Sequence, residues 1–435
     1  MSNTQKFSVV YLEKLNNIEC IGSCDGDATC FSQCYRGQAA CEADCPCFEN
    51  CYDGCPCDTF DCEFVCLIPE ETLDHREEKI SEVTLNLNEG DFIGTRYENA
   101  NVELFKGVPF AQPPVGELRW KPPMPVKSWD KPLHAGNVTR QCSQLMGTQD
   151  SFEYFERNDI VGEDCLTMEI WRPIQHYNTK LPIAVYIHGG AFYFGNSLLI
   201  GSHIIQKDLI IVFIQYRLGI FGFMNTWSDD GFTETNGNYG LLDQQLAIEF
   251  VKQNAENIGG DPNRITILGE SAGSMSVSYQ LLSDTCDMIS GAIQQSGAAV
   301  FDQTNQESNY ANDFIEVLTE GFGLSTGGPD YNVAQLRSVS ASDILYGDID
   351  IFESGRPNNP YWMPIRNDGV FYKEDAQKKL DDGRVCTSMA YMIGTNSFEG
   401  SLIYLDNSSY KPSNITGIFD VLKGKFAKII NVEQV

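Results

Sequence analysis

The sequence has few basic residues and no long apolar run. Its 30 Lys and Arg are half as many as its 60 Asp and Glu, which gives a formal net charge of −30. Nucleic acids and anionic membranes bind basic surfaces, so the sequence predicts neither as a partner. No stretch approaches the roughly 18–20 apolar residues of a transmembrane helix, so we expect no membrane span. The 435 residues and 42% hydrophobic content are enough for a large core.

Cysteine is scarce along most of the chain and concentrated in one segment. Twelve of the 16 cysteines lie between Cys20 and Cys66, and the others are Cys142, Cys165, Cys286 and Cys386. This density indicates an oxidising compartment and predicts a disulfide-rich module. A zinc–thiolate cluster is the alternative, which the aromatic residues of the segment disfavour. We therefore expect no metal and no cofactor. The sequence assigns no partner to Cys286 or Cys386, and free thiols fit as well as a bridge.

Composition divides the chain into four segments. Residues 1–19 are unassigned, 20–66 form the cysteine-rich module, 67–79 form a charged linker, and 80–435 form a large globular body. The module is a candidate contact surface for an extracellular protein partner.

Three Asn-x-Ser/Thr sequons, at Asn137, Asn407 and Asn414, fit a secreted glycoprotein. The N-terminus carries no signal peptide, because its apolar run Phe7–Leu12 is too short for one. We therefore expect an extracellular or cell-surface protein whose N-terminus, as given, is incomplete or processed.

From residue 80 onward, short apolar runs alternate with helical patterns. Val83, Leu85 and Leu87 alternate as in an edge strand, and residues 239–256 carry apolar side chains at helical spacing. The apolar runs that resemble buried parallel strands are Ile183–Ile187, Leu209–Gln215, Ile265–Leu268, Ala292–Gln294 and Met389–Ile393. Strands that alternate with helices predict an α/β fold.

Ser271 is the strongest candidate for chemistry. It lies in Gly269–Gly273 (GESAG), directly after the apolar run Ile265–Leu268 and before a helix-compatible stretch. A strand–turn–helix elbow of this kind holds a serine hydroxyl above a sheet, where it can attack an acyl carbon. His188–Phe192 (HGGAF) follows an earlier strand, and its small residues allow backbone N–H groups to converge on an oxyanion. The two motifs in this order support each other.

The body resembles the type-B carboxylesterase and cholinesterase family of α/β-hydrolases, in a region from about residue 80 to 405. Beyond GESAG and HGGAF, the matching motifs are Phe105–Ala111, Pro113–Trp120, Glu163–Leu166, Gln215–Gly219, Gly237–Gln244, Gly259–Pro262 and Gln295–Gly297. The resemblance implies a mostly parallel central sheet with helices on both faces. It also implies hydrolysis of a small-molecule carboxylic ester.

Carried over position by position, the resemblance assigns roles to single residues. Ser271 would be the nucleophile, and Glu399, in Gly394–Gly400, would be the acid that orients the base. The remaining roles are oxyanion donors for Gly190, Ala191 and Ala272, polar support for Glu270 and Ser296, and a disulfide for Cys142 and Cys165.

Histidine is the element that the sequence lacks. The five histidines are His75, His134, His176, His188 and His203. All precede Ser271, whereas the resemblance places the base well after Glu399, beyond Val435. A serine without a base is a poor nucleophile. We therefore expect a fragment or truncated form of an esterase. The alternative is a catalytically silent, cholinesterase-like adhesion or scaffold protein.

Overall fold

The computed structural model describes part of the compact unit Glu78–Val435. The described residues are 79–134, 140–144, 146–148, 151–153, 161–174, 179–196, 208–228, 231–298, 310–353, 362–365, 368–384, 386, 389–397 and 399. The cysteine-rich module and nearly all of the linker therefore lie outside them. So do the sequons at Asn137, Asn407 and Asn414 and the histidines His75, His176 and His203.

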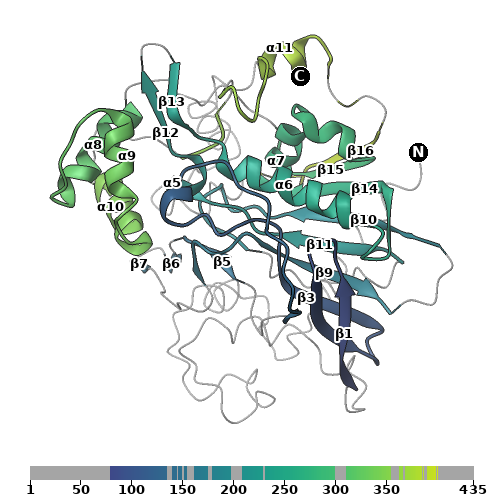
Figure 1. Ribbon diagram of the computed structural model, residues 1–435. Helices are drawn as coiled ribbons and strands as arrows, with labels where there is room; N and C mark the ends of the chain where they lie inside the picture. The colour runs from purple at the N-terminus through teal and green to yellow at the C-terminus, as the bar shows by residue number, and fades with distance from the viewer. Residues whose placement is uncertain are drawn as a thin grey trace, which may run out of the picture. The chain divides into compact units, whose positions relative to one another are not determined.

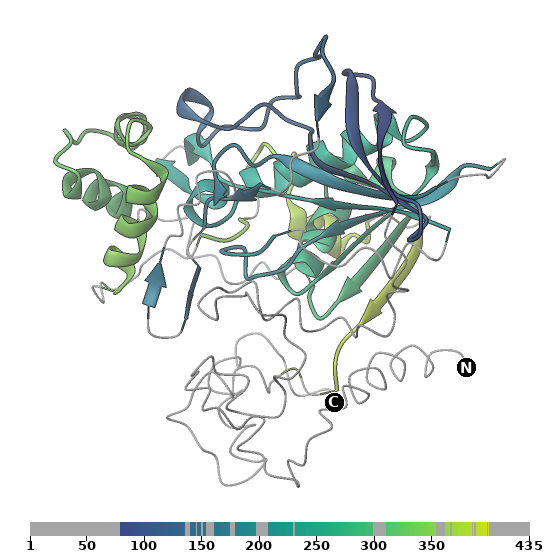
Figure 2. The same cartoon turned by 90° about the horizontal axis from the view of Figure 1, so that it is seen from below.

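A mixed β-sheet runs through the centre of this unit (Figures 1 and 2). Its strands are β1 (Ile80–Asn86), β2 (Asp91–Tyr97), β3 (Val102–Pro109), β4 (Leu133–His134), β9 (Thr167–Pro173), β10 (Leu181–Ile187), β11 (Ile210–Ile214), β14 (Gly260–Glu270), β15 (Gly291–Gln295) and β16 (Ala390–Gly394). The order is β1-β2-β3-β9-β11-β10-β14-β15-β16, with β4 beside β2. The main path is antiparallel from β1 to β11 and parallel from β11 to β16.

Three short two-stranded sheets lie outside the main one. They pair β5 (Gln141–Cys142) with β8 (Val161–Gly162), β6 (Met146–Thr148) with β7 (Ser151–Glu153), and β12 (Asn225–Ser228) with β13 (Gly231–Asn236).

The structure describes helices on the sheet and a separate helical group beside β12 and β13. They are α5 (Gly219–Phe223), α6 (Tyr239–Asn254), α7 (Ala272–Leu281), α8 (Tyr310–Gly321), α9 (Pro329–Leu336), α10 (Ala341–Glu353) and α11 (Ala376–Asp381), with the 3₁₀ turns η3 (Gly116–Leu118) and η4 (Asp284–Met288). Helices α6 and α7 pack against the parallel part of the sheet, whereas α8, α9 and α10 gather beside β12 and β13 (Figure 1). No described helix is long and apolar enough to cross a membrane.

The predicted elements of the body are confirmed, with shifts of a few residues at their ends. The apolar runs correspond to β10, β11, β14, β15 and β16, the alternating run to the edge strand β1, and the helical pattern to α6. The central strands β10 and β11 carry apolar side chains on both sides, as expected where both faces of the sheet are covered. Along β10, Ile183, Val185 and Ile187 enter the main core, while Ala184 and Tyr186 pack against a second cluster on the opposite face.

The strand order fixes where a site can form. After β10 the chain pairs β11 on one side of it, and it then crosses over to place β14 on the other side. Loops that leave neighbouring strands in opposite directions open a crevice at the carboxyl ends of those strands. The loop that follows β10 begins at His188, and the turn that follows β14 contains Ser271. The two sequence motifs therefore meet at this switch point.

The two glycines of GESAG permit the close approach of α7 to the sheet. A Cβ atom at Gly273 would lie 2.1 Å from the carbonyl oxygen of Ile187, and one at Gly269 would lie 2.4 Å from the carbonyl carbon of Gly273. Both contacts are with backbone, which cannot move away without shifting a strand or the helix. Only glycine therefore fits at these positions, and the packing fixes the start of α7 against the ends of β10 and β14.

We predict that Gly273→Ala lowers the free energy of unfolding by about 3 kcal/mol, because the added methyl group overlaps the backbone of β10. Gly321→Ala is the matched control: Gly321 ends helix α8, and a Cβ there would meet no atom within 4 Å. This control should be neutral or stabilising by up to about 1 kcal/mol. Urea unfolding of both variants measures the difference, and equal stabilities would contradict the packing argument.

Candidate active site

Ser271 occupies the sharp turn between β14 and α7. Its backbone has φ 56° and ψ −123°, a conformation that side-chain-bearing residues rarely adopt and that costs about 1–3 kcal/mol. The N–H of Ser271 donates to the carbonyl oxygen of Gln295 in β15 (2.9 Å), which holds the turn against the neighbouring strand. The serine side chain therefore stands at the carboxyl edge of the sheet, at the N-terminus of α7.

The loop after β10 also has an unusual backbone. Gly190, Ala191 and Phe192 all have positive φ angles, and a Cβ at Gly190 would lie 1.9 Å from the carbonyl oxygen of Phe194. The N–H groups of Tyr193 and Phe194 both donate to the carbonyl oxygen of Gly190. This tight turn orients the next peptide groups away from the strand. Among the described residues, no acceptor is bonded to the N–H of Gly190 or Ala191.

The glycine loop is anchored at its centre by Phe192. This ring is fully buried and packs edge-on against Phe223, with Tyr279 of α7 also close. The carbonyl oxygen of Phe192 accepts a hydrogen bond from the N–H of Gly219 at 2.7 Å. The apolar side chain thus fixes a loop whose neighbouring residues present backbone to the site.

Gln144 fixes the far end of the same loop, a role that the sequence did not predict. Its side-chain amide donates to the carbonyl oxygen of Gly195 (2.9 Å), and its amide oxygen accepts from the N–H of Gly195 (2.8 Å). The same amide donates to the carbonyl oxygen of Cys142. The structure pairs Cys142 with Cys165 in a disulfide, as the resemblance implies. Gln144 and Gly195 are 51 positions apart, so no local pattern in the sequence could indicate this contact.

The glycine loop and the serine turn lie in direct contact. A Cβ at Gly189 would lie 3.2 Å from the Cβ of Ser271 and 2.7 Å from the carbonyl oxygen of Glu270. Ala272 is the first residue of α7, and N–H groups in the first turn of a helix have no acceptor within the helix. The start of α7 and the glycine loop therefore lie on either side of the Ser271 turn, and the helix dipole adds partial positive charge at the start of α7.

Glu399 reaches the site from the segment that follows β16. Its Oε1 accepts hydrogen bonds from the hydroxyl of Ser296 (2.5 Å) and from the N–H of Asn396 (2.6 Å). These two bonds lower the pKa of Glu399, so the carboxyl is ionised at neutral pH. Ser296, with φ 56°, also donates its N–H to the carbonyl oxygen of Gly394 (2.8 Å). Ser296 is thus hydrogen-bonded both to the end of β16 and to the carboxylate of Glu399.

Glu270, the residue before the serine, lies near this carboxylate. Partial burial raises the pKa of Glu270, and the negative charge of Glu399 raises it further. The negative charge of Glu399 therefore favours the protonated form of the Glu270 carboxyl. Within the described residues, no cluster of three or more His, Cys, Asp or Glu side chains is arranged to hold a metal ion.

Of the histidines, the structure describes His134 and His188. His134 lies in β4, beside β2 and far along the sheet from β14. The Nδ1 atom of His188 lies 2.9 Å from the carbonyl oxygen of Gly189, and the ring stacks on Tyr216. Because a carbonyl only accepts, Nδ1 carries the proton, and the buried Nε2 has no partner among the residues that the structure describes. Burial lowers the pKa of His188 to about 4, so it is too weak a base near neutral pH.

Comparison with known proteins identifies the body. The model of the carboxylesterase family matches residues 81–423. The chain belongs to this family. It is 38% identical to human cocaine esterase over 301 residues, 67% of this chain and 51% of that protein. It is 43% identical to juvenile hormone esterase of Tribolium castaneum over 313 residues, 68% of this chain and 51% of that protein.

The fold agrees with that of solved carboxylesterases. A structure of PNB esterase superimposes with a TM-score of 0.64 at 30% sequence identity, covering 79% of this chain and 68% of that chain. The α/β-hydrolase fold that the sequence predicts is therefore confirmed. The chain spans about half the length of the curated relatives named above.

We predict a pH-dependent contribution of His188 to stability. The unfolded chain binds a proton at His188 below about pH 6.5, whereas the folded protein does so only below about pH 4. The wild type should therefore lose about 3 kcal/mol of unfolding free energy through this group as the pH falls from 6.5 to 4.

Urea unfolding of the wild type and of His188→Gln over this pH range measures that contribution. The acidic residues are common to both proteins, so their effect cancels in the difference. Parallel stability curves for the two proteins would show that His188 is not held neutral by burial.

Proposed function

We propose that the protein is a serine esterase that cleaves carboxylic esters through an acyl-enzyme on Ser271. The observation that carries this proposal is the strained Ser271 turn, which lies against the glycine loop at the switch point of the sheet. A non-glycine residue held at positive φ at the end of a strand is expected where the position of a hydroxyl has to be fixed.

The backbone around Ser271 supports stabilisation of an oxyanion. As Ser271 Oγ adds to the ester carbonyl, negative charge develops on the carbonyl oxygen. The N–H groups of Gly190, Ala191 and Ala272 are the donors for that charge, because the loop and the helix start hold them near the serine before any substrate arrives. Their backbone is fixed by Phe192 and by the close packing of α7, so little reorganisation accompanies the reaction.

Glu399 supports the proton-transfer part of the reaction. Its Oε1 accepts hydrogen bonds from the hydroxyl of Ser296 and the N–H of Asn396, which hold the carboxylate in one orientation. An ionised carboxylate in this position orients the N–H of a base and stabilises the cation formed when that base takes the serine proton. His134 and His188, the histidines within the described residues, are placed too far away or are too weakly basic for this step.

We propose a small-molecule ester as substrate, without assigning its acyl or alcohol part. The relatives are named for cocaine, juvenile hormone and acetylcholine, so membership of the family leaves the compound open. The bridges of the body and the cysteine-rich segment 20–66 support an extracellular or cell-surface location. We also propose that residues 20–66 contact another protein.

Covalent labelling tests the proposed nucleophile. The protein, purified from its native source, should react with a fluorophosphonate ester, and the modified peptide should carry the adduct on Ser271. The variant Ser271→Ala should neither label nor hydrolyse p-nitrophenyl acetate above background. A native protein that resists labelling would refute the esterase proposal and favour the silent adhesion or scaffold alternative.

The role of Glu399 predicts a large effect on turnover. Glu399→Gln keeps the shape of the side chain and removes its charge, so kcat should fall by about 10³–10⁴-fold. Glu399→Asp should retain more activity, and Ser296→Ala should lower kcat only about tenfold, since the carboxylate loses one hydrogen bond but keeps the bond from Asn396. Initial rates with a p-nitrophenyl ester measure all three. A kcat unchanged in Glu399→Gln would remove this residue from the mechanism.

A further inference from the structure

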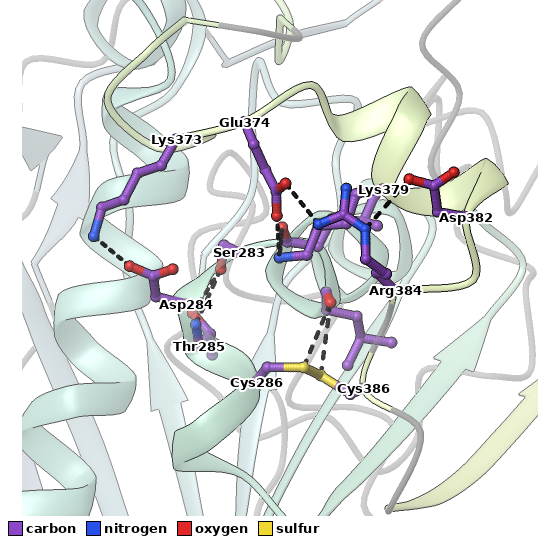
Figure 3. Close-up of polar contacts among 12 residues, drawn as sticks. Ser283, Asp284, Thr285, Cys286, Lys373, Glu374, Lys379, Asp382, Arg384 and Cys386 are labelled. Atoms are coloured by element: carbon purple, nitrogen blue, oxygen red, sulfur yellow. Dashed lines mark hydrogen bonds and ion pairs between the residues drawn. A yellow bond between two sulfur atoms is a disulfide. The ribbon is translucent and has the colours of Figure 1, made fainter.

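The structure pairs the two cysteines that the sequence left unassigned. Cys286, in η4, forms a disulfide with Cys386, which is 100 positions later in the chain (Figure 3). Cys286 lies just before β15, and Cys386 lies just before β16. These two strands pair in parallel, so the bridge ties together the segments that enter them at the same end.

The opposite end of the same strand pair carries the acid of the candidate site. Ser296 follows β15, and Glu399 follows β16. The register that pairs Gln295 with Gly394 also sets the hydrogen bond from Ser296 N–H to the Gly394 carbonyl oxygen. In this register the carboxylate of Glu399 reaches the hydroxyl of Ser296. The relative position of the two strands therefore determines where the acid stands.

Within the described residues, β15 is the main packing partner of β16. Among the strands that the structure describes, β16 is the last in the sheet, and it pairs with β15 alone. Its large side chains are exposed: Tyr391 by 52%, Met392 by 63% and Ile393 by 57%. A buried face specifies register most strongly. Within the described residues, the register of β16 therefore depends on its ladder with β15 and on the links at the entries of the two strands. A shift by one residue would move Gly394 and Glu399 away from Ser296.

The non-covalent links near the disulfide are weaker. An ion pair joins Lys373 to Asp284 between two exposed side chains, and such pairs contribute little to stability. Lys379 donates to the carbonyl oxygen of Leu282 at 2.9 Å, which holds α11 near the end of α7 (Figure 3). The ion pair of Arg384 with Glu374 lies within the segment that precedes Cys386 and does not cross to η4. The covalent bond is therefore the strongest link between the entries of β15 and β16.

We propose that the Cys286–Cys386 disulfide is a positioning element for catalysis, because it fixes the register of β16 on β15 and thereby places Glu399 beside Ser296. The catalytic consequence rests on the proposed esterase function, whereas the effect on register does not. The bridge acts through the strand pair and touches no reacting atom.

Amide hydrogen exchange in the double variant Cys286→Ser/Cys386→Ser tests the effect on register. Exchange in peptides that cover residues 389–399 should accelerate at least about tenfold, while peptides from β10 and β14 should stay within about twofold of the wild type. Lys373→Ala is the matched control, because it removes the exposed link between the same two segments, and it should leave exchange in β16 unchanged. Unchanged exchange in β16, or an equal increase in all strands, would overturn the proposal.

Reduction of the folded wild type provides a second route if the double variant does not fold. A water-soluble phosphine and water convert a disulfide into two thiols and the phosphine oxide. Cys286 and Cys386 are partly exposed, whereas Cys142 and Cys165 are 1% and 0% exposed, so within the body mild treatment should open Cys286–Cys386 before Cys142–Cys165. Alkylation and peptide mapping identify the opened pair, and the same exchange pattern is expected. Unaltered exchange in β16 after opening of this pair would also refute the proposal.

Kinetics separate this proposal from the esterase proposal. If both hold, opening the bridge should lower kcat at least about tenfold with KM within about twofold, because Glu399 acts on the transition state. A protein that shows the exchange pattern but never labels at Ser271 would refute the esterase function and leave the register effect standing. An active protein with unchanged kcat after opening would refute the positioning role.

Discussion

The site depends on the close packing of helix α7 against the ends of β10 and β14. Gly269 and Gly273 allow this contact, since a Cβ at either position would overlap backbone. The helix therefore starts at once after the strand, and the intervening Ser271 is forced to a positive φ. The same contact brings Gly189 against the Cβ of Ser271. The position of Ser271, the direction of the helix dipole and the place of the glycine loop thus all depend on the close packing of α7 on the sheet.

A second set of contacts, between neighbouring strand ends, links Ser271 to Glu399. Ser271 is bonded through its N–H to Gln295, the last residue of β15, and the next residue, Ser296, is bonded to Gly394 and Glu399. Each step is a short hydrogen bond between neighbouring strand ends, so an error in strand register would pass directly to the carboxylate. This explains why a covalent bond at the far end of β15 and β16 matters for groups at their carboxyl ends.

The sequence predicted the parts of the fold and site that depend on local pattern. The strands β10, β11, β14, β15 and β16 were predictable from apolar runs, and Ser271 and the glycine loop from turn-forming motifs that follow two of those strands. The contacts that hold these parts were not predictable, because their partners are distant. Gln144 reaches Gly195 across 51 positions, and Cys286 reaches Cys386 across 100. The buried state of His188 likewise depends on the ring of Tyr216, which the segment after β11 supplies.

We propose that the backbone N–H groups of Gly190, Ala191 and Ala272 converge on one point beside Ser271 Oγ. The most direct measurement is a crystal structure of the protein after reaction with a phosphonate that mimics the tetrahedral intermediate. We predict that the phosphoryl oxygen lies about 2.7–3.1 Å from the backbone nitrogens of all three residues. A phosphoryl oxygen that points away from the glycine loop into solvent would contradict it.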